Sequence, residues 1–391
     1  MNMNEQMKES EESILHTYNR FPVVFEKGQG CYLYDSEGKE YLDFAAGIAV
    51  NSLGYHYPGY DEALKDQIDK LMHISNLYYN EPIIEAGAKL VKASKMSKAF
   101  FTNSGTEAIE GALKAAKKYA YVRDGHADHE IIAMNHSFHG RSIGALSVTG
   151  TAHYREPFEP LMGGVKFADF NDLESVKAQI TDKTCAIITE VVQGEGGIYP
   201  AKKEFLEGLR QICDEKDIML IFDEIQCGMG RTGHYFAWQA YGVQPDIMTS
   251  AKALGCGVPV GAFVLSEKAA KASLEPGDHG TTYGGNPFVC AAVSKVFDIY
   301  ENDKIIEHVQ EMTPYLEQKL DEIVAKHECA ATRRGMGFMQ GIVIQGRPVG
   351  EVVKAALAKG LLVISAGSDV LRIVPPLVIT KEHIDKMASI L

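Results

Sequence analysis

The sequence has 391 residues, of which 46% are hydrophobic and 23% charged, a composition typical of globular proteins with two or three domains. Its 52 acidic and 39 basic residues give a formal net charge of −13, which disfavours nucleic acid and anionic membranes as main partners. No apolar run approaches the roughly 18 residues of a membrane span. The polar, acidic residues 1–12 lack the pattern of a signal peptide.

Helices and strands alternate along most of the chain. Residues 30–43 alternate apolar and polar side chains around a Ser-Glu-Gly-Lys turn, which predicts a hairpin. The strands expected after residue 60 are 130–135, 184–192, 218–223 and 245–249, and the helices expected among them are 106–123 and 202–217. This pattern predicts an α/β fold with a mostly parallel sheet covered by helices on both faces.

The C-terminal part has a different pattern. The helices expected there are 287–302, 305–326 and 351–359, and a strand pair is expected at 337–344 and 371–374. We expect a smaller α+β domain that the N-terminal hairpin joins. The expected organisation is 1–58 as an N-terminal segment of the small domain, 59–295 as the large domain and 296–391 as the C-terminal small domain.

The cysteines and histidines do not form a metal-binding pattern. The seven cysteines are scattered and include no Cys-x-x-Cys pair, which argues against a disulfide framework or a zinc ribbon and favours a reducing cytoplasm. His136 and His139 have His-x-x-His spacing, but no cysteine or acidic ligand lies near them at metal spacing. We therefore expect both histidines in a loop, and no metal.

Lys252 follows the strand predicted at 245–249 and precedes a glycine-rich turn. Its small neighbours would let a flat carbonyl cofactor reach the amine, and an apolar pocket would lower the pKa of that amine. A solvated surface lysine is the alternative. Asp223 ends a buried strand, where a carboxylate needs a cationic partner such as a protonated pyridine nitrogen, or an arginine such as Arg231. Gln226 could donate a hydrogen bond to a phenolate oxygen.

Residues 103–108 precede a clear helix. Gly105 lets the backbone approach a ligand, and the first N–H groups of the helix favour a phosphate. Ser104 and Thr106 add hydroxyl groups. The alternative is a plain helix cap, in which Ser104 and Glu107 form a capping box.

Four further residues are candidates for a binding site. Phe138 could stack on a planar ring, or could be an ordinary core residue. Arg141 and Arg372 lie in apolar sequence, which suits either the capture of a carboxylate or an internal salt bridge. Glu195 lies on a glycine loop, where it could pair with a buried arginine and release it.

Residues 228–233 match Gly-x-Gly-x-x-Gly, but they do not follow a strand directly and do not open a helix. A dinucleotide fingerprint needs both neighbours. The sequence therefore does not favour a nicotinamide oxidoreductase.

Together these stretches resemble the class III, fold type I, pyridoxal-phosphate aminotransferases, and most of all their acetylornithine branch. The resemblance runs from residues 35–39 to 371–373 and is strongest over 223–233 followed by Lys252. It implies that pyridoxal 5'-phosphate is the cofactor, that Lys252 bonds to it and moves the proton, and that Asp223 pairs with its ring nitrogen. It further implies that Phe138 stacks on the ring and that Gln226 contacts the phenolic oxygen, with the phosphate on Gly105, Thr106 and Thr282.

The resemblance also implies a homodimer with active sites at the interface, where Thr282 reaches across to the phosphate. Thr281 is expected to contact the substrate. Arg141 is expected to bind the distant carboxylate of either substrate, whereas Arg372 binds the near carboxylate of glutamate. Glu195 is expected to neutralise Arg372 when no near carboxylate is present.

The expected reaction is transfer of the terminal amine of N2-acetyl-L-ornithine to 2-oxoglutarate, a step of arginine biosynthesis. Ornithine, succinylornithine and 4-aminobutyrate are the rival donors. Gly47 stands where ornithine enzymes of this family carry a tyrosine, so an acyl group has room there. A relative that binds the cofactor without catalysis is disfavoured because Lys252, Asp223, Arg141 and Arg372 are all present.

Overall fold

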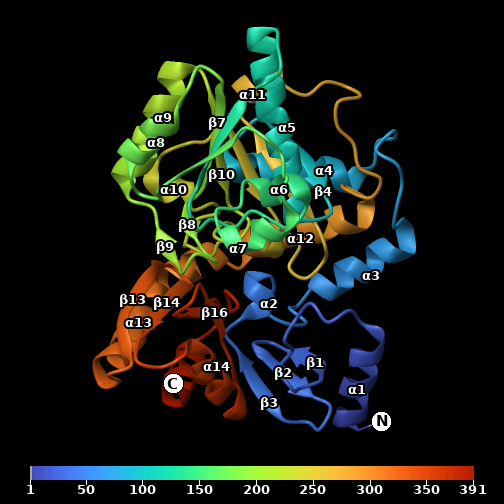
Figure 1. Cartoon of the computed structure of the whole chain (residues 1–391). Coiled ribbons are helices and arrows are strands. Elements are labelled where there is room, and N and C mark those ends of the chain that lie inside the picture. The colour runs from blue at the N-terminus through green and yellow to red at the C-terminus, as the bar shows by residue number, and fades with distance from the viewer. Residues whose placement is uncertain (1) are drawn as a thin grey trace.

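A seven-stranded sheet forms the upper part of the molecule in Figure 1, a computed structural model that describes residues 2–391. The strand order is β4-β12-β11-β10-β7-β5-β6. These strands are β4 (Lys98–Thr102), β5 (Glu130–Met134), β6 (Val165–Ala168), β7 (Thr184–Glu190), β10 (Met219–Asp223), β11 (Ile247–Ser250) and β12 (Gly261–Leu265). Strand β12 is antiparallel to both neighbours, and the other pairs are parallel. The predicted mostly parallel sheet is therefore confirmed.

The strands are apolar on both faces because helices cover both faces. Along β10, Ile221 packs into the cluster under α5 (Gly105–Asp124), whereas Leu220 and Phe222 pack into the cluster under α9 (Lys203–Lys216). This alternation is the period of two that a strand imposes. Helix α5 buries Ala108, Ala112, Ala115 and Ala116, so its backbone packs close to the sheet.

The other elements surround this sheet or build the lower part of the molecule. The remaining helices are α1 (Met3–Ser13), α2 (Ala46–Ala49), α3 (Tyr60–Lys70), α4 (Glu81–Ser94), α6 (Ile143–Ser147), α7 (Ala152–Arg155), η1 (Glu156–Phe158), α8 (Leu173–Gln179), α10 (Trp238–Tyr241), η2 (Lys252–Leu254), α11 (Glu267–Lys271), α12 (Pro287–Asn302), α13 (Ile305–Lys326), α14 (Val349–Ala358) and α15 (Lys381–Ile390). The remaining strands are β1 (Phe25–Gln29), β2 (Tyr32–Asp35), β3 (Glu40–Asp43), β8 (Val192–Gln193), β9 (Tyr199–Pro200), β13 (Ala330–Met336), β14 (Met339–Ile344), β15 (Leu361–Leu362), β16 (Ile364–Ala366) and β17 (Val370–Ile373).

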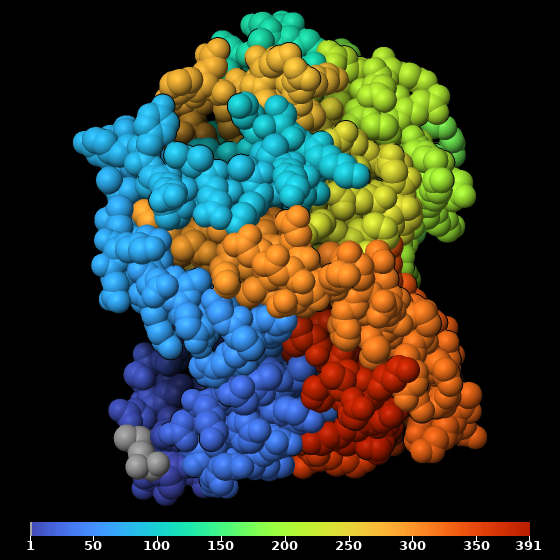
Figure 2. All heavy atoms as spheres, turned by 180° about the vertical axis from the view of Figure 1, so that it is seen from behind, coloured from blue at the N-terminus to red at the C-terminus, as the bar shows by residue number. Residues whose placement is uncertain are grey.

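The N-terminal and C-terminal segments lie side by side in the lower part of the molecule (Figures 1 and 2). The predicted hairpin is β2 and β3, and β15 from the C-terminal segment pairs with β3 in parallel. A second sheet, of order β13-β14-β17-β16, packs beside it. The N-terminal hairpin thus joins the C-terminal part through a shared sheet, while the domain boundaries at residues 58 and 295 stay predictions.

One turn of left-handed helix connects the hairpin to the rest of the chain. Residues 46–49, the segment α2, have φ angles of 48°, 64°, 66° and 62°. Residues other than glycine pay roughly 1–2 kcal/mol each for this conformation. The buried Asp43 carboxylate accepts hydrogen bonds from the N–H groups of Ala45 and Ala46 at 2.9 and 2.8 Å, and from the Tyr55 hydroxyl at 2.7 Å. These bonds hold the strained turn.

The cysteines behave as core residues. All seven are free and six are buried. Burial raises the pKa of the Cys185 thiol to about 11, so little of the reactive thiolate forms at neutral pH. Across residues 2–391, no helix has both the length and the apolar character that crossing a membrane requires.

Candidate active site

A cavity of about 470 Å³ opens at the carboxyl ends of β5, β7, β10 and β11. This is the edge where ligands bind in sheets of this kind. The predicted site residues that line it are Gly105, Thr106, Phe138, Arg141, Asp223, Gln226 and Lys252. Val50, just after the left-handed turn, also lines the cavity. Segments far apart in the sequence therefore meet around one space.

Lys252 follows β11 after Ala251 and has a left-handed backbone, with φ of 48°. Its side chain faces the cavity. Burial of the amine lowers the pKa of Lys252 to about 8, and the nearby positive charge of Arg372 acts in the same direction. The lowered pKa agrees with the sequence prediction and makes the neutral, nucleophilic amine accessible near neutral pH.

Asp223 is the last residue of β10 and is only 4% exposed. Its carboxylate lies 2.7 Å from His139 Nδ1 and accepts hydrogen bonds from the Thr249 hydroxyl at 3.2 Å and the Ile225 N–H at 3.0 Å. The alternative prediction, an ion pair between Asp223 and Arg231, is wrong, because the Arg231 guanidinium donates to backbone carbonyls at residues 338 and 375. The carboxylate is thus held rigidly at the cavity wall.

Sequence reasoning missed His139 as a site residue. The histidine lies in the loop after β5, as expected, but it is buried and orients Asp223. Its other ring nitrogen, Nε2, has no hydrogen-bond partner within residues 2–391. The only signal in the sequence is its position directly after Phe138.

Glu190 is a second missed residue. It ends β7 in register with Asp223 on β10 and lines the cavity. Burial raises the pKa of Glu190 well above its usual value, and the nearby Asp223 raises it further. Two carboxyl groups in one site do not both ionise easily. Burial and the nearby Asp223 carboxylate thus both favour the neutral form of Glu190.

The N-terminus of α5 points its positive end at the cavity through Gly105 and Thr106. A Cβ atom on Gly105 would lie 2.9 Å from Ile225 Cδ1, so any larger residue there would displace the Ile225 side chain. Ser104 caps the helix by accepting from the N–H of Glu107 at 3.3 Å. The reciprocal capping box is wrong, because the Glu107 carboxylate accepts from Asn103 instead. The cap and an anion site are therefore compatible.

Arg372 reaches the site from β17 of the lower part and is 3% exposed. Its guanidinium donates to Glu195 Oε1 at 2.6 Å, Gln226 Oε1 at 3.1 Å and the Ser365 carbonyl at 3.1 Å. Glu195 lies in the glycine-rich loop between β8 and β9, next to Gly194 and Gly196. The predicted ion pair between this glutamate and a buried arginine is present.

Arg141 differs from Arg372 in almost every respect. Arg141 is exposed, so the prediction that apolar residues surround it is wrong on the side that faces solvent. Its guanidinium carbon lies 4.0 Å from the ring centroid of Tyr154 and 5.3 Å from that of Phe138. No carboxylate pairs with it in the part of the chain that the structure describes. Arg141 is thus a free cation at the cavity mouth.

Thr281 and Thr282 do not line the cavity. The Thr281 hydroxyl oxygen accepts from Asn103 Nδ2 at 3.2 Å and from the Gly284 N–H at 3.1 Å. Thr282 is exposed. The substrate contact of Thr281 and the phosphate contact of Thr282 across a dimer interface stay predictions.

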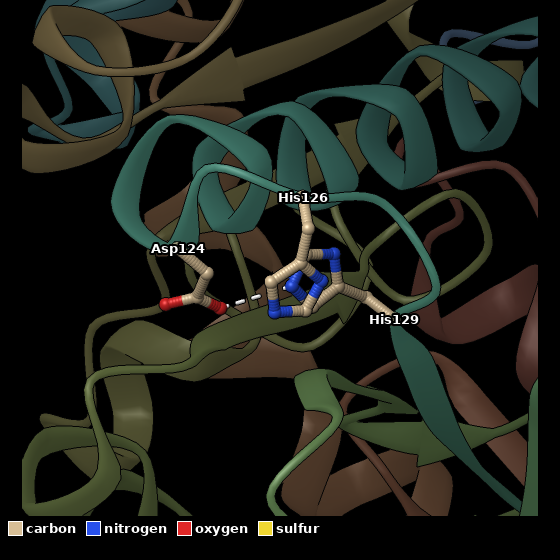
Figure 3. Close-up of side chains that lie close together, drawn as sticks. All are labelled: Asp124, His126 and His129. Atoms are coloured by element: carbon tan, nitrogen blue, oxygen red, sulfur yellow. Dashed lines mark hydrogen bonds and ion pairs between the residues drawn. The ribbon is translucent and has the colours of Figure 1, made fainter.

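Three potential metal ligands gather elsewhere, at the end of α5 (Figure 3): Asp124, His126 and His129, whose ligand atoms lie within 4.8 Å of one another. The two imidazole rings stack at 4.9 Å with an interplanar angle of 15°, so their in-plane lone pairs do not converge on one ion. Arg123 already holds both Asp124 oxygens, at 2.6 Å each. The group is an ion pair with a stacked histidine, and its geometry does not suit a metal.

Comparison with known proteins agrees with this site. The family described as Aminotransferase class-III matches residues 14–391. An acetylornithine aminotransferase from Clostridium acetobutylicum is 48% identical over 97% of this chain and 98% of its own. A succinylornithine transaminase from Yersinia pseudotuberculosis is 44% identical over 96% of this chain and 92% of its own. The crystal structure of ornithine aminotransferase from Toxoplasma gondii ME49 superposes with a TM-score of 0.95 at 29% identity, covering 100% of this chain and 94% of that one. The site brings together the lysine, the buried aspartate, the helix N-terminus and the two arginines described above. Together with the family match, they identify the chain as a member of the class-III aminotransferases, which use pyridoxal 5'-phosphate.

Proposed function

We propose that the protein transfers the terminal amino group of N2-acetyl-L-ornithine to 2-oxoglutarate, giving N-acetylglutamate 5-semialdehyde and glutamate, as a step of arginine biosynthesis. One observation carries the proposal: the site has two unlike arginines, Arg141 without an anion and Arg372 masked by Glu195. A donor with one carboxylate and an acceptor with two need such a pair. The 48% identity to an acetylornithine aminotransferase supports the same donor.

The residues around the cavity fit pyridoxal 5'-phosphate. The cofactor supplies an aldehyde for the amino group and a ring that stabilises negative charge at the substrate carbon. Lys252 provides the amine that holds the aldehyde and then moves a proton at the substrate carbon. Asp223, oriented by His139, pairs with the protonated ring nitrogen. The fit rests on the buried carboxylate, the lysine of lowered pKa, and the helix N-terminus at Gly105.

Further cofactor contacts follow from the same arrangement. Phe138 offers its ring face, and Thr106 with Gly105 offers N–H groups to the phosphate. Gln226 lies between the cavity and Arg372, where its amide can donate to the phenolic oxygen while its own oxygen accepts from Arg372.

The substrates are distinguished by charge. Arg141 binds the distant carboxylate that both substrates carry. Glutamate and 2-oxoglutarate present a second carboxylate near the reacting carbon, and this carboxylate takes Arg372 from Glu195. Acetylornithine has no charge there, so Glu195 stays on Arg372 and avoids a buried unpaired charge.

An exposed apolar patch supports a homodimer. It consists of Leu71, Met72, Leu77, Tyr78, Tyr79, Ile84 and Tyr283, of which Tyr79 is 95% exposed. The patch spans the segment between α3 and α4, at the edge of the molecule in Figure 1, and adjoins the Thr282 segment. Patches of this kind mark interfaces. A second copy covering it would bring Thr282 to the partner's cavity, and sedimentation would give the dimer mass.

The test is a half-reaction panel. The yellow, cofactor-loaded enzyme is mixed in turn with acetylornithine, succinylornithine, ornithine and 4-aminobutyrate, and the loss of the visible absorbance band is followed. We expect acetylornithine to react fastest. The Lys252→Ala variant, which lacks the amine, controls for bleaching that is not enzymatic. Reaction with 4-aminobutyrate but not with acetylornithine would contradict the proposed donor.

Succinylornithine is the second candidate donor. It differs from acetylornithine only in its acyl group, and a relative named for it is 44% identical. Gly47 lines a second cavity and not the one around Lys252, so it does not distinguish the two acyl groups. The free, buried cysteines fit a reducing compartment, so we place the reaction in the cytoplasm.

A further inference from the structure

Arg141 needs something to hold its side chain while no substrate is bound. The main chain on its C-terminal side is fixed: the Ser142 N–H donates to the Thr106 hydroxyl oxygen at 3.2 Å, and the Ser142 hydroxyl donates to Glu110 Oε1 at 2.6 Å. The Ala145 N–H donates to the same Glu110 oxygen at 3.1 Å. Glu110 is therefore occupied by α6, and the guanidinium of Arg141 is left without a carboxylate.

Tyr154 is the residue that meets this guanidinium. It lies on α7, beside α6 at the lower rim of the upper part (Figure 1). Its ring centroid is 4.0 Å from the guanidinium carbon, closer than the Phe138 ring at 5.3 Å. Tyr154 and Phe138 themselves pack edge to face at 5.9 Å. The half-buried tyrosine thus links the arginine to the aromatic ring expected beside the cofactor.

An aromatic face suits this task better than a carboxylate does. A ring attracts the cation through its quadrupole but does not neutralise it. A carboxylate would compete with the substrate for the arginine, as Glu195 does at Arg372. The ring therefore restricts the side chain and leaves its N–H groups free for a bidentate contact with an incoming carboxylate.

We propose that Tyr154 is a positioning residue, which holds Arg141 ready for the distant carboxylate of both substrates. This inference rests on the proposed function, in which Arg141 binds that carboxylate. Because both substrates use Arg141, the loss of the ring weakens the binding of both. It leaves the proton transfer at Lys252 unchanged.

The test compares Tyr154→Phe, Tyr154→Leu and Tyr154→Met in the cofactor-loaded enzyme. The Phe variant keeps the ring, so we expect KM values within about twofold of the parent. Each aliphatic variant is expected to raise KM for acetylornithine and for 2-oxoglutarate roughly tenfold, inside the range of cation–π interactions, with kcat changed less than about twofold. Glutarate, which has no reacting group, gives a binding constant through the shift it causes in the visible band. That constant is expected to weaken by the same factor.

His153→Leu is the matched control, because His153 neighbours Tyr154 on α7 and its ring lies 4.0 Å from the tyrosine ring. Unchanged KM and glutarate binding in both aliphatic variants overturns the inference. A Phe variant that is as impaired as the Leu variant also overturns it, because the aromatic ring would then not be what holds Arg141. If acetylornithine fails as a donor but glutarate and 2-oxoglutarate still bind more weakly to the aliphatic variants, the donor assignment fails and the role of Tyr154 stands.

Discussion

The floor and the rim of the cavity are built on different principles. The floor, which consists of Lys252, Asp223 and His139, comes from strand ends of one sheet, and its carboxylate has fixed partners. The rim, which consists of Arg141, Arg372 and Glu195, comes from both parts of the molecule, and its pairings are exchangeable or absent. In the proposed function, the steps that every substrate shares fall to the rigid floor, and recognition falls to the rim arginines, one of which is paired with Glu195.

The largest effect is expected at the floor. Lys252→Ala removes the amine that holds the cofactor and moves the proton, so we expect kcat to fall by at least about 10⁴-fold. Borohydride reduction followed by mass measurement would show no cofactor bonded to this variant. Lys203→Ala, at an exposed lysine, is the control and should keep both properties. A variant that keeps measurable covalent labelling would place the attachment elsewhere.

At the rim, Arg372→Gln is expected to damage one half-reaction more than the other. It removes the partner of the near carboxylate and leaves Glu195 unpaired, so the 2-oxoglutarate half-reaction should slow by roughly 10²- to 10³-fold. The acetylornithine half-reaction should lose much less. Single-turnover absorbance measures each half separately. Arg333→Gln, which lies in the same sheet but pairs with Glu317 and Asp321, controls for loss of sheet structure, and equal losses in both halves would contradict the assignment.

Glu195→Gln tests whether the ion pair acts as a charge switch. Without the carboxylate, Arg372 is unpaired when acetylornithine binds, so that half-reaction should slow by roughly ten- to thirtyfold relative to the glutamate half-reaction. The ratio of the two single-turnover rates is the measured quantity. An unchanged ratio would show that Glu195 does not mask the arginine.

The smallest expected effect is the pH dependence of cofactor capture. The pKa of Lys252 is lowered to about 8, so the amine is protonated and unreactive below that pH and neutral above it. Capture by the cofactor-free enzyme, followed at the visible band, should therefore rise about tenfold from pH 7 to 9 and then level off. With an exposed lysine, whose pKa is about 10.4, the rate of capture would keep rising beyond pH 9. Such a profile would contradict a buried amine.

Much of the fold could be predicted from the sequence because its signals are local. Helices α12 and α13 begin and end at the predicted residues because their helical spacing is regular; Asn286 caps α12, whereas no side chain caps the start of α13. Strand β12 was not predicted, and its direction could not be, because a buried apolar strand has the same pattern in either direction. His139 and Glu190 were missed for a related reason: their importance comes from contacts with Asp223, which is 84 residues away from His139 in the chain.

The exposure of Arg141 is another feature that local sequence signals do not reveal. Nearby Ala145 and Leu146 are buried, but Ile143 is exposed and Arg141 lines the cavity. The left-handed turn at residues 46–49 could not be predicted either, because three of its four residues are ones that rarely adopt that conformation.

That turn makes residue 47 a position that favours glycine. Gly47 has φ of 64° and ψ of 33°, and a Cβ atom there would lie 3.2 Å from Asn51 Nδ2, the atom that donates to the Tyr55 hydroxyl. A side chain at this position would meet both the strained conformation and the hydrogen bonds that reach Asp43. The turn and these hydrogen bonds therefore change as a unit, and a substitution at residue 47 also disturbs the segment that carries Val50 to the cavity.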